Sequence, residues 1–183
     1  MKKIKILFFV IFISHSCSNK NNNADSSLIV EKDNSVLPSN SDRIEKPLLP
    51  IKQIIALAQN HFSTYNKKLV SEYTTIGLNN AYTGDFTNDG KEDVVIYYSI
   101  EPTNGGNYLA GQGLALYKNN GDSVSLITSY TPDYLFSFDK VSGGNIFISK
   151  EEYTEDDPRC CPSIHKQIEL TVNGEKIYER NIN

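Results

Sequence analysis

The sequence contains few of the residues and motifs on which enzymes most often depend. Its 183 residues include no tryptophan, one methionine, three histidines and three cysteines. The nucleophile elbow G-x-S-x-G, the phosphate-binding P-loop and the zinc motif H-E-x-x-H are all missing. Only His61 and His165 lie beyond the N-terminal segment as candidate imidazole bases. The case for catalysis is therefore weak, and the sequence leaves the biochemical activity open.

A net positive charge is missing too. The formal charge of the whole chain is −4. The first sixteen residues hold three of the 18 basic residues and none of the 22 acidic ones, so the chain from residue 17 onward carries −7. Affinity for nucleic acid depends on neutralising phosphates with lysine and arginine. The sequence therefore argues against a nucleic-acid partner.

No apolar run reaches the roughly 20 residues that a comfortable membrane span requires. The longest, residues 6–13 (ILFFVIFI), follows three lysines and precedes Ser14, Ser16 and Cys17. A positive start, a short apolar run and small residues are typical of a secretory signal. The end of this segment resembles the lipobox of bacterial lipoproteins. Ser16 and Cys17 match it, whereas Ser14 and His15 depart from it.

This resemblance implies cleavage before Cys17, a lipid such as palmitate on that cysteine, and attachment to a membrane. Two or more acyl chains would anchor the protein stably, because one chain gives only marginal binding. We therefore expect a lipid-anchored protein of the bacterial cell envelope, in the periplasm or on the outer-membrane surface. An ordinary cleaved signal peptide and a short transmembrane anchor are the alternatives.

Composition divides the chain into three parts. Residues 1–16 are the expected signal peptide. Residues 17–47 are the expected lipidated cysteine and disordered tether, because 18–47 hold six asparagines, six serines and two prolines with no helical or strand period. Residues 48–183 are the expected single folded domain, which is long enough to have its own core.

Hydrophobic periodicity predicts an α+β fold for that domain. Apolar residues recur at steps of three and four from Ile51 to Tyr65, which predicts one amphipathic helix at its N-terminal end. Runs of β-forming residues follow, and Asn120-Gly121 and Asn173-Gly174 are typical hairpin turns. We expect the helix to pack on a mostly antiparallel sheet of about six or seven strands. The predicted strands are residues 93–100, 113–117, 124–130, 145–149, 168–172 and 176–179, with 132–138 ambiguous.

The segment from Asp85 to Asp93 (DFTNDGKED) is the most distinctive chemical motif. Oxygen-bearing side chains stand at its first, third, fifth and ninth positions, and glycine stands at the sixth. Calcium prefers six to eight hard oxygen ligands. The predicted ligands are the carboxylates of Asp85, Asp89 and Asp93, the hydroxyl of Thr87 and the backbone carbonyl of Lys91. An exposed acidic Asp-Gly turn without a metal is the alternative.

This motif is not an EF-hand, because Ile96 stands at the twelfth position and the loop leads into a strand. It resembles the calcium loop of FG-GAP and VCBS repeats, with Thr87 departing from their pattern. The resemblance covers about a dozen residues and implies calcium as a bracing ion. A propeller needs four or more blades, and the loop occurs once, so the resemblance does not extend to that fold.

The second distinctive motif is Asp157 to Ser163 (DPRCCPS). Cys160 and Cys161 are the only thiols besides Cys17. In an oxidising compartment a disulfide between them is one outcome. Adjacent α-carbons lie about 3.8 Å apart, which is closer than in most disulfides, so such a bond would be strained. Free buried thiols, a redox site, and a soft-metal site with His165 remain the alternatives.

Together, the stretches from Gly84 to Val94 and from Asp157 to Ser163 resemble the small exported bacterial lipoproteins that include the LppP/LprE-like ones. To our knowledge that group has no defined activity, so the resemblance implies location and architecture only. We expect a membrane-anchored, non-enzymatic binding or structural domain with a calcium-braced loop and a protein or glycan partner. The alternatives are an envelope hydrolase using the acidic run of residues 151–157, a thiol-redox protein, and an immunity or inhibitor protein that presents an acidic face.

Overall fold

The computed structural model describes residues 47–106 and 108–182. The expected signal peptide, the lipidated Cys17 and the tether therefore lie outside the described residues, apart from Pro47. None of the helices in the described part of the chain has the length and apolar character needed to cross a membrane.

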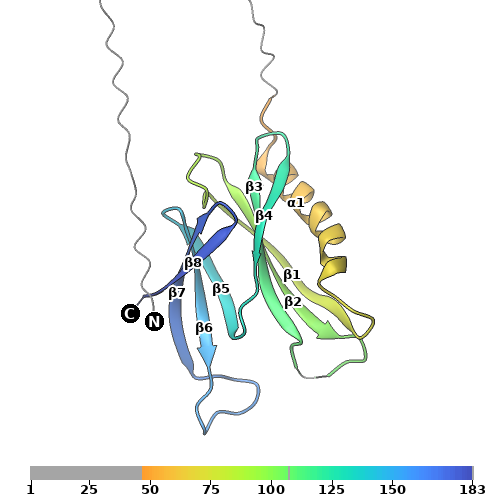
Figure 1. Cartoon of the computed structure of the whole chain (residues 1–183), viewed down its shortest axis with the longest axis vertical. Coiled ribbons are helices and arrows are strands. Elements are labelled where there is room, and N and C mark those ends of the chain that lie inside the picture. Colours follow the sequence, from red (N-terminus) through yellow and green to blue (C-terminus); the bar gives the residue numbers. More distant parts are fainter. Residues whose placement is uncertain (1–46, 107, 183) are drawn as a thin grey trace, which may run out of the picture. The chain divides into compact units, whose positions relative to one another are not determined.

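One α-helix and eight strands form the domain (Figure 1). Helix α1 spans Ile51–Tyr65, and a 3-10 turn, Asn66–Lys68, follows it. The strands are β1 Thr74–Gly84, β2 Asp93–Pro102, β3 Gly111–Asn119, β4 Val124–Tyr130, β5 Leu135–Ser142, β6 Asn145–Glu152, β7 Ile164–Asn173 and β8 Lys176–Ile182.

The strands form two four-stranded antiparallel sheets, β1-β2-β3-β4 and β5-β6-β7-β8. The α+β class is confirmed, but the predicted sheet is wrong, because there are eight strands in two sheets rather than six or seven in one. The helix spans the predicted residues 51–65, which begin fifty residues into the chain and open the described domain. The predicted hairpins at Asn120-Gly121 and Asn173-Gly174 are confirmed, because β3 pairs with β4 and β7 pairs with β8.

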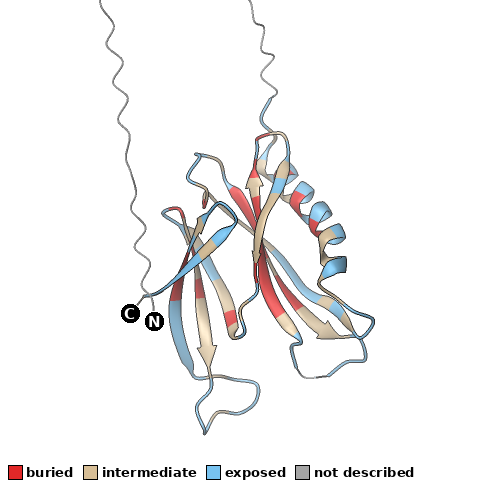
Figure 2. Ribbon diagram, in the orientation of Figure 1, coloured by how far each residue is buried: buried red, intermediate tan, exposed pale blue. Residues whose placement is uncertain are grey.

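Helix α1 packs against one face of the first sheet. Its buried side chains are Ile54, Ala58 and Phe62, which recur every four residues and so lie on one side of the helix. They join a core with buried residues of β2 and β3: Val94, Ile96, Tyr98, Ala115 and Tyr117. Figure 2 shows the buried positions of the helix and of these central strands. The helix therefore covers a sheet face that would otherwise be exposed and apolar.

The opposite face of the first sheet packs on the second sheet. Alternate residues of β2 and β3 point to this side, because successive side chains of a strand point to opposite faces. The core between the sheets contains Val95, Leu114, Leu116, Tyr130, Phe136, Ile146, Ile148, Ile168 and Leu170, together with Phe86 from the β1–β2 loop. Strands β2 and β3 are thus buried on both faces.

Candidate functional site

The Asp85–Asp93 loop is organised by its own carboxylates. Both oxygens of Asp85 accept backbone N–H groups, from Asp89 at 3.1 Å and from Gly90 at 2.8 Å. Asp93 is fully buried and accepts the amides of Thr87 and Asn119, each at 2.9 Å. Burial raises the pKa of Asp93, and those two amides partly offset the effect. The motif therefore forms a tight turn, and Asp93 connects this turn to β3 by accepting the Asn119 amide.

Two lysines lie beside the Asp89 carboxylate of the loop. The ammonium groups of Lys91 and Lys118 each lie 3.0 Å from Oδ2 of Asp89. Desolvation opposes ionisation of Asp89, but these two lysines outweigh it and leave its pKa lowered. The cationic charge beside Asp89 is therefore supplied by the protein itself.

Thr87, one of the predicted ligands, has a buried hydroxyl that finds no hydrogen-bond partner of normal geometry in the part of the chain that the structure describes. Its hydroxyl is still close enough to the Asp93 carboxylate to help lower the pKa of that group. An unpartnered buried oxygen suits a cation ligand. Within the described residues, however, no three carboxylate, histidine or cysteine side chains are grouped so that they could hold a metal. Calcium would bind only if Asp89 broke its ion pairs with the two lysines and ligated the ion instead. Calcium binding at this loop stays a prediction.

The loop also meets the second sheet. Asn88 has a positive φ of 56°, and its side chain lies directly against Gly144 in the β5–β6 turn. Gly144 has a φ of 77°, which favours glycine, and a side chain there would also have to displace the Asn88 amide. Phe86 is inserted in the core between the sheets. The loop therefore links the two sheets, whether or not it binds an ion.

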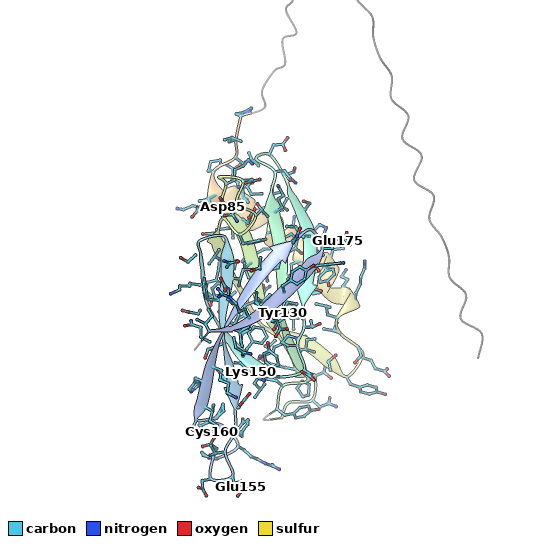
Figure 3. The ribbon with its side chains drawn as sticks, turned by 60° about the vertical axis from the view of Figure 1, so that its left-hand side comes forward. Asp85, Tyr130, Lys150, Glu155, Cys160 and Glu175 are labelled. Atoms are coloured by element: carbon cyan, nitrogen blue, oxygen red, sulfur yellow. A yellow bond between two sulfur atoms is a disulfide. The ribbon has the colours of Figure 1, made fainter. Side chains whose placement is uncertain are left out.

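The second motif lies in the β6–β7 loop, and the Asp85 and Cys160 loops are at opposite ends of the domain (Figure 3). Asp157 organises this loop by accepting the amides of Thr154 at 2.8 Å and Ser163 at 2.9 Å, and the Ser163 hydroxyl at 3.0 Å. The two amides lower the pKa of Asp157 to about 2. Asp157 is therefore a structural anchor of the loop.

Cys160 and Cys161 are joined as a disulfide in the structure, with α-carbons 3.8 Å apart. Both residues are exposed, which does not fit buried thiols. The amide of Cys161 donates to the carbonyl of Pro158 at 3.0 Å, and the hydroxyl of Tyr153 donates to the carbonyl of Arg159 at 2.8 Å. The chemical state of the two sulfurs in the native protein stays a prediction.

The remaining sequence candidates are not brought together. Glu152 in the acidic run forms ion pairs with Lys150 and Lys166. His61 packs edge-on against Tyr117, with 3.2 Å between its Nδ1 and the phenol oxygen. His165 is exposed on β7, and in the described part of the chain it does not form a metal-binding group with the two cysteines.

The structure adds a groove that the sequence reasoning missed. An open groove of about 1130 Å³ lies where the first sheet meets β5, β6 and two loops. Its aromatic lining comes from β2, the β2–β3 loop, β5 and the β6–β7 loop: Tyr97, Tyr108, Phe136 and Tyr153. Cys160 and Pro162 of the second motif also line it. The only signal in the sequence is its high tyrosine content, which does not say which tyrosines meet.

Hydrogen bonds between the two sheets hold the floor of this groove. The carbonyl of Phe136 accepts both the Tyr97 hydroxyl at 2.8 Å and the Gln112 side-chain amide at 2.9 Å. Tyr97 and Gln112 belong to the first sheet and Phe136 to the second. The floor of the groove is therefore held by contacts between the two sheets, whereas two of its walls come from loops. Ligand sites are usually largely preformed in this way.

Comparison with known proteins finds no family model, no curated protein and no solved structure that matches the chain.

Proposed function

We propose that this protein is an exported, lipid-anchored lipoprotein of the bacterial envelope whose folded domain binds a ligand without transforming it. The groove beside Cys160 is the single observation that carries this proposal. It is larger than the roughly 300–1000 Å³ that is usual for small-molecule sites, and it combines aromatic side chains with a few polar groups. Binding is therefore a better account of the described residues than catalysis.

The N-terminal segment supports the location. An apolar run at residues 6–13, closely followed by Ser16 and Cys17, suits a lipidated cysteine, and residues 18–47 suit a tether. A flexible chain of that length reaches a root-mean-square distance of roughly 30 Å. That distance would hold the groove clear of a membrane surface.

Calcium is the proposed brace of the Asp85–Asp93 loop. The unpartnered hydroxyl of Thr87 and the neighbouring carboxylates are hard oxygen donors. Since this loop links the two sheets at the end of the domain away from Cys160, the ion would stabilise the scaffold without entering the groove.

A thiol-redox protein is the second candidate, because Cys160 lines the groove and would meet any ligand bound there. A dithiol substrate would be oxidised to its disulfide as Cys160 and Cys161 gain two electrons and two protons. Cys160→Ser would abolish that exchange, whereas a binding protein would keep its ligand in the same variant.

The binding proposal is tested with the full chain, expressed in a bacterium that lipidates exported proteins and purified in detergent. Tyrosine-ring NMR signals of the 11 tyrosines are recorded with cocktails of small molecules. Perturbations should gather on Tyr108 and Tyr153, and not on the exposed controls Tyr73 and Tyr178. Perturbations scattered over the controls, or none at all, would count against a groove-binding protein.

The location is tested separately by fractionating the same cells. The wild-type chain should be found in the membrane fraction and incorporate labelled palmitate. Cys17→Ser should lose the label and leave the membrane. An unlabelled wild-type chain would contradict lipid anchoring while leaving the groove proposal intact.

A further inference from the structure

The charges of the groove have a clear bias. Its lining includes three carboxylates, Glu101, Glu151 and Asp157, and one cation, Arg159. No lysine or histidine is present among the described lining residues. The groove therefore carries a formal charge of −2 beside its aromatic rings, and it is complementary to a cation rather than to an anion.

Two of these carboxylates are not neutralised by the protein. Within the described residues, no ion pair engages Glu101 or Glu151. The Glu101 carboxylate accepts the Ser99 hydroxyl at 2.8 Å and packs over Gly77 of β1, which fixes its position without neutralising its charge. Asp157 instead is occupied by the amides and hydroxyl of its own loop.

The negative charge of the groove carboxylates also acts on the aromatic floor of the groove. Burial, and then the Glu151 carboxylate, raises the pKa of the Tyr97 phenol. Glu151 and Tyr97 both line the groove, on β6 and β2, so the charge of Glu151 acts on the same concavity as the Tyr97 ring.

The aromatic rings of the groove are only partly covered by protein. Tyr108 is 64 % exposed and Tyr153 is 46 % exposed, although both line the concavity. The face of an aromatic ring attracts a cation electrostatically, and alkylated ammonium ions are the ligands that aromatic cages recognise. The groove lining contains both chemical parts of such a cage, aromatic rings and carboxylates, on separate elements.

We infer that the groove binds a small alkylammonium ion, with Tyr108 and Tyr153 contacting its alkyl groups and Glu101 and Glu151 compensating its charge. This inference rests on the proposed function and names the ligand class for the same groove. Arg159 lies on the exposed loop at the rim, where a ligand that also carries an anionic group would pair with it.

The test compares choline with 3,3-dimethylbutan-1-ol, a neutral molecule of nearly the same shape. Both are titrated into the full chain in detergent, with tyrosine-ring NMR as the readout. Choline should shift the Tyr108 and Tyr153 signals and bind at least several-fold more tightly than the neutral alcohol. The choline affinity should also fall as sodium chloride is raised, because salt screens exposed charges.

Variants assign the effect to residues. Tyr108→Ala should weaken choline binding by about two- to fivefold, as expected for one partly exposed cation–π contact. Glu151→Gln should weaken choline and leave the neutral alcohol unchanged. Tyr73→Ala and Glu175→Gln are the matched controls, since neither residue lines the groove, and they should change neither affinity.

Each contrary result has its own meaning. Equal affinity for choline and the alcohol would overturn the cation inference while the groove stayed a binding site. If trilysine displaced choline at lower concentration, the occupant would be a lysine-bearing peptide and the assignment to a small ion would be wrong. If choline shifted only the signals of Tyr73 or Tyr178, choline would bind outside the groove, and the groove would not be the site.

Discussion

At the scale of single residues, Tyr98 stands out because its hydroxyl is buried and has no hydrogen-bond partner among the described residues. The oxygen lies against Gly113, where a side chain would collide with it. An unsatisfied buried polar group costs about 1–3 kcal/mol. We therefore expect Tyr98→Phe to raise the free energy of unfolding by about 1 kcal/mol in urea titrations.

Tyr117→Phe is the matched control for this prediction. Tyr117 is equally buried in the same core, but its hydroxyl hydrogen-bonds with His61. Losing that bond should lower the stability by about 1 kcal/mol. A Tyr98→Phe protein that is no more stable than Tyr117→Phe would show that the Tyr98 hydroxyl is satisfied in solution.

Asp157 carries a second prediction at the residue scale. Its folded pKa of about 2 lies below the ordinary value of 3.8, because backbone amides favour the carboxylate. The stabilisation of the loop is therefore present above about pH 4 and is lost as the pH falls towards 2. The Tyr153 ring signal should follow this change, and Asp157→Asn should show the low-pH signal already at pH 7. Asp156→Asn is the control, because the two amides donate to Asp157 and not to its neighbour. This variant should behave as wild type.

At the scale of elements, the Asp85–Asp93 loop supports a metal-dependent prediction. At a hundredfold excess over its dissociation constant, calcium contributes about 2.7 kcal/mol. That corresponds to a rise of about 5–10 °C in the melting temperature relative to chelator. Asp89→Ala should abolish the rise, whereas Asp133→Ala, an exposed aspartate outside the loop, should keep it. No rise in the wild-type chain would leave the loop as an acidic turn neutralised by Lys91 and Lys118.

How far the elements could be predicted depended on whether their signals are local. Helix α1 is marked by the regular spacing of its apolar residues, and the two hairpins are marked by their turn residues. These signals lie within a few positions of one another, and the elements are confirmed. Strand β1 was missed because its sequence, TTIGLNNAYTG, is polar and includes glycine and asparagine. Its place as an edge strand comes from pairing with β2, which no local pattern reveals.

The candidate sites could likewise be predicted only where their residues are close together in the sequence. The sequence located both loops, since their acidic and cysteine residues are contiguous. It did not reveal the lysine from β3 that reaches Asp89, or the pairing of Phe136 with Tyr97 across the sheets. The groove is built from side chains that are up to 65 positions apart in the sequence, from Tyr97 to Pro162. Such a site exists only once the two sheets have packed together.

At the scale of the described domain, the core between the sheets should make them unfold together. The Phe136 side chain is 2 % exposed and contacts the rings of Tyr97 and Tyr130 in the first sheet. Phe136→Ala should therefore lower the free energy of unfolding by about 3–5 kcal/mol, a large part of the stability of an ordinary domain. The Tyr98 and Tyr178 ring signals, one from each sheet, should disappear at the same lowered urea concentration.

Phe147→Ala is the control for this last prediction, because Phe147 lies on β6 but outside the shared core and is only half-buried. It should cost clearly less than Phe136→Ala. If Phe136→Ala instead released Tyr178 well before Tyr98, the sheets would be separate folding units. The groove between them would then be an adjustable junction, and its affinity for any ligand would include the cost of docking one sheet on the other.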